Sequence, residues 1–318
     1  MKKKTVAGLI GVAAAGLGAA GGVAALSGLL YNKCVASSAK PKETLEVWPD
    51  LQEGRAWAKR AENFRSLTIP AVDGLKLWAA LVPAKGESHR WAICVHGYRE
   101  CHEAVGVLGK YYVEHGWNVL MPDLRGHGSS QGSYVGWSYD DRLDLVSWIN
   151  YVVRRDPEAE IVIHGVSMGA ATVMMATGGP LQDNVKAAVA DCGFTDLEHL
   201  LHHYFSRVGH KALSLPPSIP FKALFALLRK TVLRRAGYDL KDVVPLQAVA
   251  RSKTPTLFIH GGCDDVVPPE MMGKLYEAAR CPKRYLMVPA ATHADSVGVD
   301  PKRYWDAVES FLNRYING

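Results

Sequence analysis

The sequence predicts one α/β domain on a mostly parallel sheet flanked by helices, preceded by a short N-terminal segment. Two observations support this fold class. Short apolar strands alternate with helical stretches, which is typical of parallel sheets covered on both faces. The motif Gly165-Val166-Ser167-Met168-Gly169 also lies between an apolar strand and an Ala-rich helix. A chain of 318 residues is long enough for one such domain and an appendage.

Charge and cysteine content exclude several classes of protein. The formal net charge is +6, of which +5 comes from residues 1–40, so the rest of the chain is nearly balanced. This balance gives no reason to expect a nucleic-acid partner. The six cysteines form no Cys-x-x-Cys pair, so they indicate neither a zinc site nor a disulfide framework.

The first forty residues predict a membrane segment. Lysines at positions 2–4 precede an uncharged apolar stretch from Val6 to Leu30. Roughly twenty apolar residues span a bilayer as a helix, and the lysines should stay cytoplasmic. We therefore expect residues 1–40 to be a single-pass signal-anchor in the cell membrane, with residues 41–318 as an extracytoplasmic domain. Cleavage near Ser37-Ser38-Ala39, followed by secretion, is the alternative.

The remaining elements follow in order. Residues 40–65 are polar and helical, and form either a juxtamembrane helix or the first element of the domain. Two alternating runs around Asp73-Gly74 predict a β-hairpin. Further strands are predicted at residues 91–95, 118–121, 161–164, 185–190, 256–259 and 283–288, with helices at 101–115, 139–154, 170–176 and 301–315. Asp300-Pro301 has the form of a helix N-cap.

Residues 195–250 interrupt this alternation. Within them, residues 221–235 place apolar side chains on one helical face and basic side chains elsewhere. An insertion after a late strand is expected to form a helical cap over the carboxyl ends of the strands. A packed surface helix pair without a gating role, or a basic helix on a membrane surface, are the alternatives.

Ser167 is the candidate nucleophile. A serine needs a histidine to take its proton and an acid to orient that histidine, and after this motif the expected chain order is serine, acid, histidine. His293 follows the strand at 283–288, and Asp264 and Asp265 follow the strand at 256–259. Spacing alone does not separate the two acids. The amide of Met168, at a helix N-terminus, is placed to donate to an oxyanion.

With these motifs, the sequence from about residue 67 to 315 resembles the α/β-hydrolase superfamily. It is most similar to compact bacterial serine hydrolases, esterase-like or serine aminopeptidase-like, with a short cap and an N-terminal anchor. Their His-Gly-x-x-Asp-x-x-Val-Pro stretch matches residues 260–268, so the resemblance implies that Asp264 is the acid. Their His-Gly segment matches His96-Gly97-Tyr98, which implies the Tyr98 amide as second oxyanion donor. Residues 123–130 match the family's Asp-x-Arg-Gly-His-Gly-x-Ser segment, which is usually structural. We therefore interpret His127 in this segment, and His96 in the His-Gly segment, as residues that hold loops in place and not as bases.

The resemblance implies a serine hydrolase that cleaves carboxylic esters of small to medium acyl groups through an acyl-enzyme. Peptidase, aminopeptidase or thioesterase activity would use the same residues, and a non-enzymatic binding scaffold is a further alternative. No nucleotide cofactor is expected, because no phosphate-binding glycine loop follows a strand, and no metal is expected, because His102-Glu103 lacks a second histidine at the spacing of a metalloprotease helix. His199, His202 and His203 share a helical face and could hold a metal, but are expected to line or cover the cleft. The expected partners are a small ester or short peptide substrate and the membrane.

Overall fold

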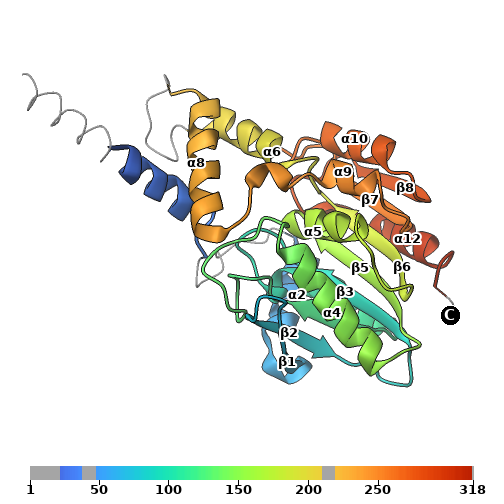
Figure 1. The fold of residues 1–318 in the computed structure, drawn as a ribbon. Coiled ribbons are helices and arrows are strands. Elements are labelled where there is room, and N and C mark those ends of the chain that lie inside the picture. Colours follow the sequence, from blue (N-terminus) through green and yellow to red (C-terminus); the bar gives the residue numbers. More distant parts are fainter. Residues whose placement is uncertain (1–21, 38–47, 210–218, 317–318) are drawn as a thin grey trace, which may run out of the picture.

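The computed structural model describes residues 22–37, 48–209 and 219–316. Its centre is an eight-stranded sheet in the order β1-β2-β4-β3-β5-β6-β7-β8 (Figure 1). The strands are β1 (Arg65–Pro70), β2 (Lys76–Val82), β3 (Arg90–Val95), β4 (Asn118–Pro122), β5 (Glu160–Val166), β6 (Val185–Asp191), β7 (Thr256–Gly261) and β8 (Lys283–Val288). The predicted strands are all present.

The sheet is mostly parallel, as predicted. β1 and β2 form the antiparallel hairpin, and β2 also pairs antiparallel with β4. Every other neighbouring pair is parallel. Gly74 takes a φ of 85° in the hairpin turn, a conformation that glycine adopts without steric cost.

Helices cover both faces because the strand side chains alternate between two apolar layers. In β3, Ile93 and Val95 pack in one buried cluster, whereas Ala92 and Cys94 pack in another. α4 (Asp141–Arg155), α5 (Met168–Thr177) and α10 (Glu270–Ala278) lie on the first side, and α2 (Pro49–Lys59), α3 (Gly106–Glu114) and α12 (Pro301–Leu312) lie on the second. The short helices η1 (Ala61–Asn63), η2 (His102–Val105) and α11 (Ser296–Val299) complete these layers.

A helical insertion connects β6 to β7, in the region predicted as a cap. It comprises α6 (Leu197–Tyr204), the π-helical turn η3 (Phe205–Gly209), α8 (Phe221–Ala236), η4 (Leu240–Asp242) and α9 (Pro245–Val249). α8 buries the apolar face expected from its sequence, including Leu224, Phe225 and Leu228. In Figure 1, α6 and α8 lie together at one end of the molecule. Residues 210–218 of the insertion lie outside the described residues.

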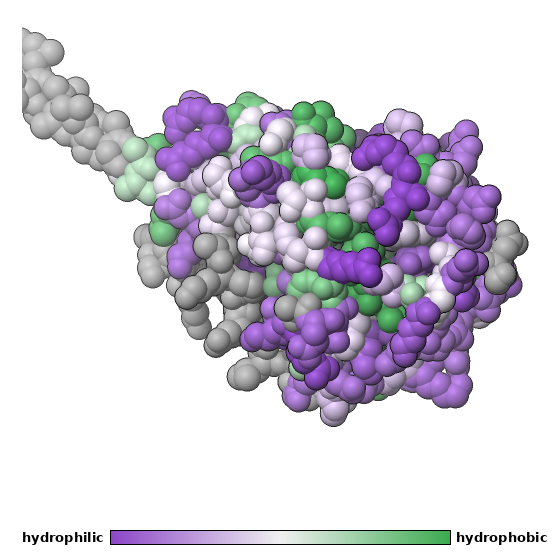
Figure 2. Space-filling model, turned by 90° about the horizontal axis from the view of Figure 1, so that it is seen from below, coloured by the Kyte–Doolittle hydropathy of each residue, from purple (hydrophilic) through white to green (hydrophobic). Residues whose placement is uncertain are grey.

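Residues 22–34 form a helix that lies beside α8 (Figure 1). Its outer part is exposed, with Val23 53% accessible, and Figure 2 shows pale green hydrophobic residues at the edge of the molecule where the described chain begins. None of the helices within the described residues has both the length and the apolar character needed to cross a bilayer. Residues 1–21, most of the predicted span, and the predicted domain boundary at residue 40 lie outside the described residues.

Candidate active site

Ser167 occupies the tight turn between β5 and α5. Its backbone has φ 56° and ψ −117°, a conformation that a non-glycine residue holds only when its surroundings enforce it. Both flanking glycines are needed for this turn. A Cβ on Gly165 would collide with the carbonyl of Gly169, and a Cβ on Gly169 would collide with the carbonyl of Val95. The sequence motif therefore forms the turn that its spacing indicated.

The structure brings together the three predicted side chains Ser167, His293 and Asp264. The Oγ of Ser167 lies 2.8 Å from Nε2 of His293, and Nδ1 of His293 lies 2.8 Å from Oδ2 of Asp264. The three residues follow the carboxyl ends of β5, β8 and β7, where parallel sheets present their ligand sites. The arrangement can move a proton from the hydroxyl to the imidazole and stabilise the resulting imidazolium.

The two candidate acids have different surroundings. Asp264 is buried and accepts hydrogen bonds from the amides of Val266, at 2.9 Å, and Val267, at 2.8 Å. Burial alone would raise the pKa of Asp264, but hydrogen bonds from His260 and His293 hold it well below its usual value. The carboxyl group therefore stays ionised at neutral pH. Asp265 is exposed and pairs with Arg207 at 3.1 Å, so it does not face His293.

The loop from residue 96 to 98 lies against Ser167. A Cβ on Gly97 would stand 3.4 Å from the Cβ of Ser167, so the backbone that leads into Tyr98 runs close to this serine. Met168 is the first residue of α5, so its N–H has no acceptor within the helix. These are the two amides predicted to bind an oxyanion.

His96 and His127 hold this loop in place. Nδ1 of His96 donates to the carbonyl of Gly97 at 2.8 Å, and its Nε2 accepts the amide of Leu124 at 2.9 Å. Burial lowers the pKa of His96 to about 3, so the ring is neutral and can both donate and accept. Nε2 of His127 accepts the amide of Arg99 at 3.1 Å. Both histidines fix loops, as the sequence suggested.

Ser167 and His293 open into a cavity of about 800 Å³. Its wall is largely apolar and combines residues from α3, from the insertion and from the N-terminal helix. The apolar wall residues include Leu51, Val105, Val107, Leu108, Trp137, Phe194, Leu200, Leu201, Phe205, Phe221, Leu224, Phe225 and Leu228, and the N-terminal helix adds Leu30, Lys33 and Cys34. Sites for small organic molecules typically have volumes of about 300–1,000 Å³ with this apolar character.

Comparison with known proteins gives the family. Residues 86–222 match the family described as serine aminopeptidase, S33. Uncharacterized protein Rv2307c of Mycobacterium tuberculosis is 32% identical over 253 residues, which cover 78% of this chain and 79% of that one. The chain belongs to the serine aminopeptidase S33-like family of α/β hydrolases.

Two further proteins are similar to this α/β hydrolase. Uncharacterized protein YqkD of Bacillus subtilis is 30% identical over 203 residues, 64% of each chain. The Pyrococcus furiosus esterase Pf2001 superposes with a TM-score of 0.65 at 21% identity, and the match covers 89% of this chain and 100% of that one. At that identity the likeness establishes the fold alone.

The α/β hydrolase also buries an acid that the sequence analysis missed. Asp191 ends β6, and its carbonyl accepts the amide of Ser167 at 2.8 Å. Its Oδ2 accepts the hydroxyl of Tyr304 at 3.1 Å, and that hydroxyl lies 2.9 Å from Nε2 of His164. Burial raises the pKa of Asp191 to about 6. Its position directly after the predicted strand at residues 185–190 was a signal in the sequence that could have pointed to Asp191. The acid was instead taken from Asp264 and Asp265, which follow the next strand and match the family motif at residues 260–268.

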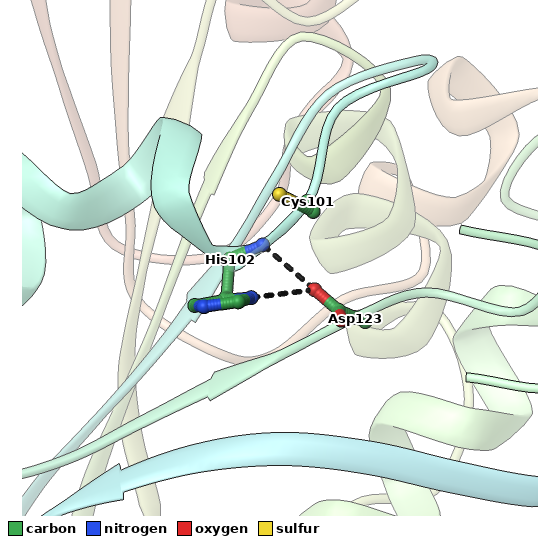
Figure 3. A group of neighbouring side chains, drawn as sticks. All are labelled: Cys101, His102 and Asp123. Atoms are coloured by element: carbon green, nitrogen blue, oxygen red, sulfur yellow. Dashed lines mark hydrogen bonds and ion pairs between the residues drawn. The ribbon is translucent and has the colours of Figure 1, made fainter. Parts of the chain in front are cut away.

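A cluster of residue types that can bind metals, Cys101, His102 and Asp123, lies beside β4 in the hydrolase (Figure 3). Oδ1 of Asp123 accepts both the amide of His102, at 2.7 Å, and its Nδ1, at 3.0 Å. Oδ2 accepts the amide of Ser129 at 2.7 Å. Burial also raises the pKa of Cys101 to about 12, so the thiol stays protonated. The cluster therefore ties two loops together.

The three histidines of α6 have separate partners. Nδ1 of His199 bonds Asp196 at 2.7 Å, and Nε2 of His203 bonds the carbonyl of Asp265 at 3.0 Å. The ring of His202 packs on Phe221 with centroids 4.8 Å apart. Since each ring has its own contact, the histidines do not converge on one point, and none of the three is among the residues that line the cavity.

Proposed function

We propose that this α/β hydrolase cleaves carboxylic esters through an acyl-enzyme on Ser167. The observation that carries the proposal is the hydrogen-bonded chain from Ser167 through His293 to Asp264, with 2.8 Å at each step. His293 takes the serine proton as Oγ attacks the ester carbonyl, and returns it to the leaving alkoxide. Water then attacks the acyl carbonyl and gives a proton to His293, the bond from the acyl carbon to Oγ of Ser167 breaks, and His293 returns the proton to Oγ as the carboxylic acid leaves. The amides of Tyr98 and Met168 bind the oxyanion in both steps.

An ester fits the cavity better than a free-amine peptide. Recognition of a peptide N-terminus needs an unengaged carboxylate near the serine. Of the acids in the cavity wall, Glu100 pairs with Arg55 at 3.2 Å, and Asp191 accepts the Tyr304 hydroxyl at 3.1 Å. Asp295 accepts the hydroxyl of Thr292 but keeps its charge, so it is the wall acid that a peptide ammonium would meet. The largely apolar wall favours an acyl chain, and aminopeptidase activity is the second candidate because of Asp295 and because the matching family carries that description.

Two measurements test this proposal. A fluorophosphonate probe should label the wild-type chain and fail to label Ser167→Ala, since the probe reacts only with an activated serine. Persistent labelling of the variant would remove Ser167 as the nucleophile. A series of chromogenic acyl esters assayed beside aminoacyl amides then separates the candidates. A higher kcat/KM for the aminoacyl amides than for the esters would show that the protein is an aminopeptidase and not an esterase.

We also propose that the N-terminal segment, residues 1–40, retains the hydrolase at the membrane as a signal-anchor, through the part that precedes Leu30, since residues 30–37 pack against the domain. Support comes from the basic residues 2–4 followed by an uncharged apolar stretch to Leu30. Fractionation of expressing cells should recover the chain with membranes, and protease added from outside should digest the domain. Recovery of a shortened chain in the medium would favour signal cleavage and secretion instead.

A further inference from the structure

The end of the N-terminal helix is built into the hydrolase domain. Val35 is fully buried, and its carbonyl accepts the amide of Val135 at 2.7 Å. Ala36 forms an antiparallel β-bridge with Tyr134, and the amide of Ser37 donates to the carbonyl of Ser133 at 3.1 Å. These contacts are backbone hydrogen bonds of the antiparallel β type. They fix the position of residues 35–37 relative to residues 133–135.

Side chains from loops beside Ser167 also cap this helix. The last carbonyls of a helix receive no hydrogen bond from an N–H of the helix, so they need donors from outside it. The hydroxyl of Tyr98 lies 3.2 Å from the carbonyl of Lys33 and 3.1 Å from that of Cys34. Nη2 of Arg99 donates to the Lys33 carbonyl at 2.9 Å, and Nε1 of Trp137 donates to the Cys34 carbonyl at 2.9 Å.

This cap connects the N-terminal segment to the oxyanion loop. Tyr98, whose amide is proposed to bind the oxyanion, is the residue whose hydroxyl holds the helix end. Its ring stacks on Trp137 with centroids 4.5 Å apart, and Trp137 lines the same cavity. The helix end and the loop that receives the ester carbonyl are therefore held by a shared set of bonds.

The same turn of helix contributes side chains to the cavity. Leu30 and Cys34 are four residues apart, so they share a helical face, and both line the cavity with Ser167. Leu30 is only 3% exposed and packs in the cluster that includes Leu228 of α8. Leu29, the preceding residue, is 36% exposed and does not line the cavity.

We propose that the last turn of the N-terminal helix is a specificity-determining wall of the acyl site, and that Leu30 and Cys34 contact a medium- to long-chain aliphatic acyl group. This inference rests on the proposed ester hydrolysis, and it extends the substrate class from small and medium acyl groups to long ones. An apolar volume of about 800 Å³ accommodates such a chain. Each methylene that the wall buries raises kcat/KM by up to about fourfold.

The test compares Leu30→Trp with the matched control Leu29→Trp on the full-length chain in detergent. Hydrolysis of p-nitrophenyl acetate, butyrate, octanoate and laurate is measured for each. Filling the wall with Leu30→Trp should lower kcat/KM for laurate about tenfold or more, while acetate stays within about twofold. Leu29→Trp should keep the wild-type profile. Leu30→Ala, which enlarges the site, should shift the preferred ester to a longer chain.

Binding of laurate, the free acid, separates this inference from the proposed chemistry. Calorimetric titration should show laurate binding to the wild type and to Leu29→Trp, and at least tenfold weaker binding to Leu30→Trp. That result would support the acyl wall even if no ester were cleaved. Unchanged binding and an unchanged ester profile in folded Leu30→Trp would overturn it, whereas fluorophosphonate labelling of Ser167 would leave the serine chemistry intact.

Discussion

At the residue scale, burial separates two adjacent acids, Asp264 and Asp265, that spacing along the sequence does not separate. Asp264 lies beneath His293 and accepts hydrogen bonds from two amides and two imidazoles. Asp265 points to solvent and pairs with Arg207, and exposed pairs of this kind contribute little. The carboxylate that contacts His293 is therefore the one whose charge is stabilised inside the protein.

We expect Asp264→Asn to lower kcat about a thousandfold or more, because an amide cannot stabilise the imidazolium or hold the required tautomer. Asp265→Asn should stay within about threefold of wild type. Ester hydrolysis at neutral pH measures both, and circular dichroism checks that the variants fold. A larger loss in Asp265→Asn than in Asp264→Asn would reverse the assignment of the acid.

Asp191 makes the free energy of unfolding depend on pH. Burial raises its pKa to about 6, so the folded state retains a proton that the unfolded state has already released. Stability from this group is present below pH 4 and is lost as pH rises to about 6. A shift of about two pKa units corresponds to about 3 kcal/mol. Other ionisable groups face it, namely His260, His293, Asp264, Tyr304 and Cys192.

We expect Asp191→Asn to remove this loss, because the amide stays neutral and its oxygen can still accept the Tyr304 hydroxyl. The free energy of unfolding of the variant should rise relative to wild type by about 2–3 kcal/mol between pH 4 and pH 7. Urea titrations at several pH values measure the difference. Parallel pH profiles for the two proteins would show that Asp191 has an ordinary pKa in the fold.

The residues that a sequence reveals here are those whose chemistry depends on local spacing. Ser167 sits in a five-residue motif, and Asp264 and His293 each follow a strand. Tyr304 could not be found in this way, because its contact with Asp191 depends on packing between elements 113 residues apart. Leu30 was assigned to a membrane segment because apolar composition is the same in lipid and in a cavity wall.

At the element scale, the β5–turn–α5 unit depends on two close backbone approaches. Gly169 lies against the carbonyl of Val95, so β3 and α5 can be this close only without a side chain between them. The strands, the hairpin and the helices could be predicted because their apolar residues recur along the sequence with the period of a strand or of a helix. The placement of the insertion over the strand ends was predicted from chain order, but its contact with the N-terminal helix was not.

We expect Gly169→Ala to destabilise the fold by about 1–3 kcal/mol or more, since the new Cβ would force the helix from the sheet. Gly273→Ala in α10 is the matched control, because nothing lies within 4 Å of its Cβ position. That change should stabilise by about 0.5–1 kcal/mol through helix propensity. Thermal unfolding compares the two. Equal melting temperatures would contradict the close packing at Gly169.

At the scale of the whole molecule, residues 30–37 are joined to the packed core of the hydrolase by three buried side chains. Leu30, Tyr31 and Val35 are all buried in its largest apolar cluster, and Arg235 of α8 lies over the Tyr31 ring at 5.0 Å. Cleavage near residues 37–39 would remove these side chains together with part of the cavity wall. The packing therefore favours a chain that keeps its N-terminal segment.

Two truncations test this dependence. Deletion of residues 1–21 should leave the melting temperature of the hydrolase within about 2 °C of the full chain in the same detergent, since it removes none of these core contacts. Deletion of residues 1–37 should lower it by about 10 °C, because three buried side chains each contribute about 1.5–3 kcal/mol. It should also weaken laurate hydrolysis more than acetate hydrolysis. If both truncated chains melt at the same temperature and keep the wild-type ester profile, residues 30–37 are dispensable to the fold and to the site.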